Sequence, residues 1–78
     1  MRSVKQMWDS FAYVLPGDAP DVQRTEMRRA FYAGAWGVLM EAHAIGEESV
    51  SEAAGIAHLE ALRAELMQFH ADLRAGKA

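Results

Sequence analysis

The 78-residue sequence contains no cysteine. That absence excludes disulfide bonds and thiolate metal ligands, so neither can supplement the core of so short a chain. A single domain of this size normally gains only about 3 to 5 kcal/mol of net stability unless a cross-link, a metal or association adds to it. Unless His and carboxylate side chains hold a metal, association with another chain is the remaining source of added stability. The sequence therefore favours an oligomer.

Long apolar runs and an excess of basic residues are also missing. The N-terminal segment MRSVKQMWDSF is interrupted by polar residues and lacks the continuous apolar stretch of a signal peptide. No stretch approaches the roughly 20 apolar residues that span a membrane. We therefore expect a soluble, cytoplasmic protein. The net charge of −3 argues against a general nucleic-acid binder, because such domains are usually basic.

Proline is scarce, and both copies fall in the segment 16–21, the one convincing break before residue 46. Ahead of this segment, Ser3 and Gln6 have the spacing of a capping box, and apolar residues then recur at helical intervals. This pattern predicts a short helix over about residues 4–14. A long helix is predicted over about residues 20–45.

A third helix is predicted over about residues 50–74. Gly46 is a plausible residue just beyond the end of the second helix, and Ser49 with Glu52 has the spacing of a second capping box. The link between the two long helices would then be only about three residues, which makes them antiparallel neighbours. Apolar residues of the third helix alternate at intervals of three and four, the pattern of a heptad seam. This leucine seam consists of Leu59, Leu62, Leu66, Phe69 and Leu73.

The predicted fold class is therefore all-α: a short N-terminal helix followed by an antiparallel two-helix hairpin, in a single domain of residues 1–78. The second helix has no charged residue between Ala30 and Met40. Such a segment is buried on more than one face, which predicts assembly into a helical homo-oligomer. Small residues four apart would let another helix come close, either from a second subunit or within the hairpin, and a ligand or lipid is a third alternative. The predicted interface residues are Ala30, Ala33, Gly34, Gly37 and Met40.

A candidate site for a small anion lies on the same helix. Arginine and aromatic residues recur there every four positions and so line one face, where guanidinium groups could bind phosphate and aromatic rings could stack on bases. The short helix adds a second aromatic group. The alternative is that the arginines are solvated, that the aromatic residues of the long helix form an interface, and that Tyr13 packs at a rim. The predicted ligand-binding residues are Arg24, Arg28, Tyr32, Trp36, Tyr13 and Trp8.

Motifs for metal binding and catalysis are weak or missing. His43, His58 and His70 lack the spacing of a metal site, and no arrangement of Ser, His and acidic residues indicates a nucleophile. We expect neither an enzyme nor a cofactor. The acidic residues Glu47 and Glu48, near the predicted turn, favour helix capping, with a negative surface patch as the alternative.

The stretch EMRRAFYAGAWGVLMEA, residues 26–42, together with the preceding VLPGDAPDVQ, resembles small accessory proteins of tailed bacteriophages. The layout of a short aromatic helix followed by a hairpin is also similar to that of the phage sponge proteins that defeat CBASS or Thoeris immunity. Those proteins form helical oligomers and sequester cyclic nucleotide signals between subunits.

This second resemblance implies a phage anti-defence protein in the cytoplasm of an infected bacterial host. It would bind and sequester a small anionic cyclic nucleotide at subunit junctions. The sequence leaves two alternatives open. One is a protein-binding inhibitor or adaptor that acts on a host protein complex, as anti-CRISPR proteins do. The other is a small structural or assembly factor of the phage particle.

Overall fold

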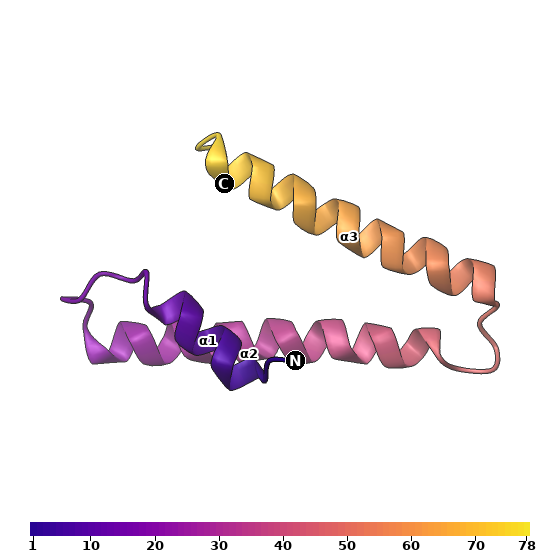
Figure 1. Ribbon diagram of the computed structural model, residues 1–78, viewed down its shortest axis with the longest axis horizontal. Helices are drawn as coiled ribbons and strands as arrows, with labels where there is room; N and C mark the ends of the chain where they lie inside the picture. Colours follow the sequence, from indigo (N-terminus) through magenta and orange to yellow (C-terminus); the bar gives the residue numbers. More distant parts are fainter. The chain divides into compact units, whose positions relative to one another are not determined.

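The computed structural model describes all residues from 1 to 78 as three helices without strands (Figure 1). Helix α1 comprises Val4–Ala12, α2 comprises Asp21–Ile45 and α3 comprises Glu52–Arg74. The predicted all-helical fold class is confirmed. The chain divides into two compact units, residues 1–40 and 41–78, and the boundary falls within α2. The antiparallel pairing of the long helices and the assembly into an oligomer stay predictions.

Helix α1 begins with the predicted capping box, which is confirmed. The Ser3 hydroxyl accepts a hydrogen bond of 3.1 Å from the Gln6 amide, and the Gln6 side chain accepts one of 2.8 Å from the Ser3 amide. The helix ends at Ala12, whereas the sequence suggested about residue 14. The amides of Val14 and Leu15 each bond to the carbonyl three residues back, so the last turn is tighter than an α-helix.

The first unit is held together by three rings, Trp8 and Phe11 of α1 and Phe31 of α2, which we call the aromatic cluster. The ring centroids of Trp8 and Phe31 are 5.5 Å apart in an edge-on arrangement, and those of Phe11 and Phe31 are 5.7 Å apart and stacked. Trp8 is only 7% exposed and is the one large hydrophobic residue that the chain buries. Figure 1 shows α1 lying across the first half of α2. Phe31 is thus the residue of α2 that packs against the rings of α1.

The second unit begins with a turn that differs from the prediction. Residues 46–51 separate α2 from α3, about twice the expected length. The predicted capping box of Ser49 and Glu52 is wrong, because Ser51 caps α3 by accepting a hydrogen bond of 3.1 Å from the Ala54 amide. The Val50 amide bonds to the Glu47 carbonyl, so Ser49 lies inside a preceding turn and cannot begin the helix.

Gly55 fixes the close approach of α3 to the last turn of α2. It is the only buried residue of α3. A Cβ atom placed there would lie 2.7 Å from the Cγ2 atom of Ile45, which is closer than two carbon atoms can pack. Because Ile is β-branched and stiff about χ1 in a helix, its methyl group cannot easily move aside. The contact therefore requires glycine.

The aromatic cluster predicts a severe effect of Trp8→Ala. Removing a buried Trp typically costs about 3 to 5 kcal/mol, which is comparable to the whole stability expected of so small a domain. We expect Trp8→Ala to unfold the first unit, as measured by circular dichroism during urea unfolding. Tyr13→Ala is the control, because Tyr13 is 91% exposed and its loss should change the unfolding free energy by no more than about 0.5 kcal/mol. Equal effects of the two substitutions would contradict this account.

Gly55→Ala is expected to destabilise the chain by about 1 kcal/mol. Alanine favours helix over glycine by about 1 kcal/mol, but overpacking typically costs about 1 to 3 kcal/mol and should exceed that gain. Urea unfolding of Gly55→Ala, Ile45→Ala and the double variant measures the coupling between the two positions. A stabilised Gly55→Ala variant, or the absence of coupling to Ile45, would show that this close approach does not constrain the fold.

Candidate functional site

The predicted ligand-binding residues all belong to the first unit, and the structure brings two of them together. The guanidinium carbon of Arg28 lies 5.2 Å from the centroid of the Tyr32 ring, within the range of a cation–π contact. Arg28 is exposed and Tyr32 is half-buried. The two residues lie one helical turn apart on α2, as their spacing of four residues predicted. This pair presents a cation on an aromatic surface to solvent.

Lys5 of α1 adds a second cation near the same pair. Its ammonium group lies 2.9 Å from the Asp9 carboxylate. The hydrogen bond to Asp9 and the negative charge of that carboxylate raise the pKa of Lys5, whereas the positive charge of Arg28 acts to lower it. Lys5 and Arg28 are both exposed, and together with Asp9 and Tyr32 we call them the Lys5/Arg28 surface. Sequence reasoning missed Lys5, and the spacing of four between Lys5 and Asp9 was the available signal.

Arg24, another predicted ligand-binding residue, contacts the backbone of the segment between α1 and α2. One of its guanidinium nitrogens donates a hydrogen bond of 2.6 Å to the Pro16 carbonyl, and the residue is half-buried. This bond ties the first turns of α2 to the segment that follows α1. Its guanidinium thus stabilises the connection between the two helices.

The remaining predicted ligand residues differ in exposure. Trp8 lies inside the aromatic cluster and is covered by its neighbours. Tyr13 caps the end of α1 and is 91% exposed, and Trp36 is 63% exposed, so both rings are open to solvent. No aromatic ring packs against either of them in the structure. Of the three, only Tyr13 and Trp36 present a free ring.

The predicted interface residues form an exposed surface on the middle part of α2. No atom lies within 4 Å of the positions that a Cβ would occupy at Gly34 and Gly37. Ala30, Ala33 and Met40 are exposed as well. At 3.6 residues per turn, Ala33 and Gly37 lie on the side of α2 away from Phe31, and hence away from the aromatic cluster. Another helix backbone could come close at these small residues.

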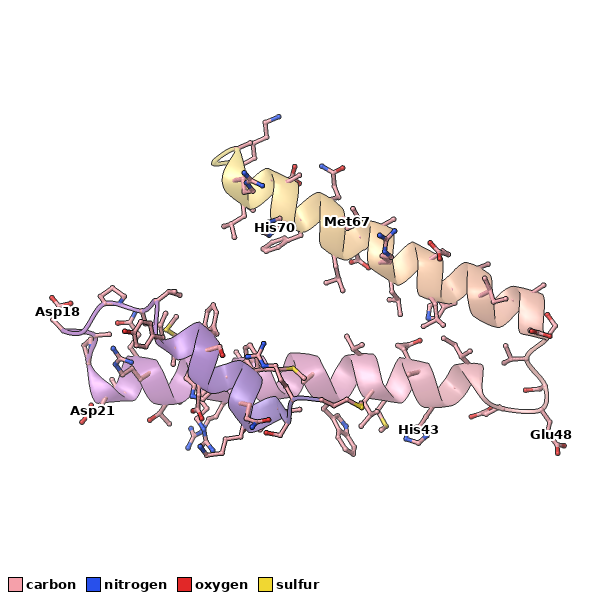
Figure 2. All side chains as sticks on the ribbon, viewed as in Figure 1. Asp18, Asp21, His43, Glu48, Met67 and His70 are labelled. Carbon is pink, nitrogen blue, oxygen red and sulfur yellow. The ribbon has the colours of Figure 1, made fainter.

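A shallow pocket of about 260 Å³ lies at the connection between α1 and α2. Its walls include Leu15, Pro16, Pro20 and Met27, and its one charged residue is Asp18. Figure 2 shows Asp18 in this connection and Asp21 in the first turn of α2. An anion would meet a carboxylate and no cationic side chain in this pocket. The pocket is therefore separate from the Lys5/Arg28 surface.

The structure contains no group of three His, Asp or Glu residues placed to hold a metal ion. His58 instead forms a hydrogen bond of 2.9 Å between its Nε2 atom and the Glu41 carboxylate, linking α3 to the end of α2 within the second unit. Glu48 lies at the outer tip of the turn between these helices (Figure 2). The turn thus carries exposed acidic residues without assembling a metal site.

None of the three helices combines the length and the hydrophobicity needed to cross a bilayer. Comparison of the chain with protein-family models, with curated proteins and with solved structures found no match. The resemblance to phage proteins therefore stays a hypothesis.

Proposed function

We propose that the protein is a non-enzymatic binding protein that acts on a protein partner through the exposed apolar surface of α2. This proposal rests on one observation: far more large hydrophobic residues are exposed than buried. The chain buries one large hydrophobic residue, Trp8, and leaves sixteen exposed. Large exposed apolar areas on small proteins mark interaction sites, since leaving them in water is unfavourable and promotes aggregation.

The charge-free segment 30–40 has the composition of an interaction surface. Gly34 and Gly37 leave open space for a partner helix, and Trp36 and Met40 flank these small residues. Aromatic and Met side chains are enriched in the centres of protein interfaces, where charged residues are depleted. Two glycines inside a helix cost about 1 kcal/mol each relative to alanine, so close packing against a partner would offset their cost.

This proposal places the protein among inhibitors or adaptors of a host protein complex. In the phage setting that the sequence suggests, it would act as an anti-defence protein in the infected bacterium. The two long helices would form an antiparallel hairpin, and the chain would work as a homo-oligomer. The absence of charge between residues 30 and 40 requires a partner with an apolar groove or helix face.

The test is site-specific photo-crosslinking from position 36 in bacterial cells. A photoreactive phenylalanine analogue replacing Trp36 should capture one host protein in a stoichiometric complex. The same analogue replacing Glu48, which is exposed at the turn, is the matched control and should capture nothing specific. Gly37→Leu, which fills the space for a partner helix, should abolish the crosslink from position 36. Crosslinks only between copies of this chain, or identical captures from both positions, would contradict the proposal.

Binding of a small anionic nucleotide is the second candidate, and the Lys5/Arg28 surface favours it. Arg28 provides a guanidinium group that can bind phosphate, and Tyr32 supports it at 5.2 Å. Lys5 of α1 adds an exposed ammonium group, which is paired with Asp9. In an oligomer, the exposed rings of Tyr13 or Trp36 from another subunit would be available to stack on a base.

A nucleotide ligand is expected to raise the melting temperature of the protein. At a free concentration about 100 times its Kd, a ligand adds about 2.7 kcal/mol to the unfolding free energy. For a domain of this size that corresponds to a shift of roughly 10 °C or more in a thermal melt. Arg28→Gln should abolish the shift and Arg63→Gln, at an exposed position of α3, should retain it. No shift with any member of a panel of cyclic mono- and dinucleotides would rule out this candidate.

A further inference from the structure

The basic side chains of the first unit differ in whether they have a polar partner. Two of them are paired with carboxylates. The ammonium nitrogen of Lys5 lies 2.9 Å from a carboxylate oxygen of Asp9. A guanidinium nitrogen of Arg29 lies 2.9 Å from a carboxylate oxygen of Glu26. Each of these two positive charges is therefore balanced by an acidic residue of its own helix.

Two further basic residues direct their guanidinium groups at neutral acceptors within the first unit. Arg2 donates hydrogen bonds to the Gln6 carbonyl and to the Ser10 hydroxyl. Arg24 donates one to the Pro16 carbonyl. Both side chains thus hold together parts of the chain itself.

Arg28 is the remaining basic residue of the first unit, and it has neither a hydrogen bond nor an ion pair. Its guanidinium carbon lies 5.2 Å from the centroid of the Tyr32 ring. A contact with the face of an aromatic ring uses none of the five N–H donors of a guanidinium group. Arg28 is exposed, so all five donors are open to a ligand or partner.

Arg28 lies at one edge of the apolar surface of α2. Arg28, Tyr32 and Trp36 follow one another at intervals of four residues and so share one side of the helix. At a rise of 1.5 Å per residue, Arg28 is about 12 Å along the helix axis from Trp36. A protein interface of standard size buries about 800 Å² on each partner, so an interface centred on Trp36 extends to Arg28.

The free guanidinium group determines what such a partner must present. Its planar fork binds a carboxylate through two parallel N–H···O hydrogen bonds. One unpaired cation balances one carboxylate, whereas a cyclic dinucleotide carries two phosphates and would need a second cation. Lys5 does not supply that cation freely, because it is paired with Asp9. Arginine, with tryptophan and tyrosine, is also enriched among the residues that dominate binding energy in protein interfaces.

We propose that Arg28 binds an Asp or Glu carboxylate of the protein partner, at the edge of the contact made by the apolar surface of α2. The proposal rests on the proposed function and narrows the chemistry of the partner to an apolar patch bordered by a carboxylate. Arg29, the next residue along the helix, has no such role because Glu26 already balances its charge.

The test uses the complex captured by crosslinking from position 36. A water-soluble carbodiimide joins an amine to a carboxylate that it contacts. In the Arg28→Lys variant, we expect an amide bond between position 28 and one Asp or Glu of the captured protein, located by mass spectrometry. Arg29→Lys is the matched control, and its amine should react within the chain, with Glu26. A captured complex without an amide bond from position 28 would overturn the proposal.

Removal of the charge provides an independent measurement. Arg28→Gln should weaken capture from position 36 at least about tenfold, because a hydrogen bond between charged groups typically contributes that much or more. Arg29→Gln should change it less than about twofold, since exposed ion pairs contribute little. The measurement is the crosslinked fraction as a function of protein concentration in host lysate.

The outcomes separate this proposal from the proposed function. Capture that does not depend on Arg28 would overturn the carboxylate contact and leave the proposed function standing. Absence of any captured host protein, with Arg28 intact, would contradict the proposed function and this proposal with it. A nucleotide-induced melting shift that requires Arg28, combined with capture that does not, would assign Arg28 to a phosphate group instead.

Discussion

The scarcity of buried apolar surface is the constraint on which the rest of this structure depends. Without cysteine, the chain has no covalent cross-link, and its three-ring aromatic cluster buries only one large side chain. This cluster is large enough to hold α1 on α2, but it does not bury the apolar residues of both long helices. The exposed apolar surface of α2 is where we propose that a protein partner binds.

The three helices followed from local signals that tertiary structure did not override. The capping box of Ser3 and Gln6, the two prolines and the apolar periodicity each act within a few residues, and the structure retains all of them. The predicted start of α3 was wrong because Ser49 and Ser51 are both residues that can cap the N-terminus of a helix. Whether Ser49 or Ser51 begins the helix depends on the turn that the Val50 amide closes with Glu47, which spacing alone does not show.

The candidate site was only partly predictable, for a different reason. Spacing of four correctly placed Arg28 beside Tyr32, since both lie on one helix. It could not show that Arg24 donates a hydrogen bond to the Pro16 carbonyl, because this contact depends on how the segment after α1 lies against α2. The same holds for Trp8, whose ring looked like a platform for a ligand and instead forms the centre of the aromatic cluster.

The two tryptophans of this chain lie in opposite environments, one enclosed by rings and the other open to solvent. Indole emission shifts to longer wavelengths in water, so the two residues supply separate optical signals from one molecule. Emission from Trp8 reports whether α1 is docked on α2, and emission from Trp36 reports whether the apolar surface of α2 is covered. Folding and association can thus be followed independently in the native protein, without an added dye.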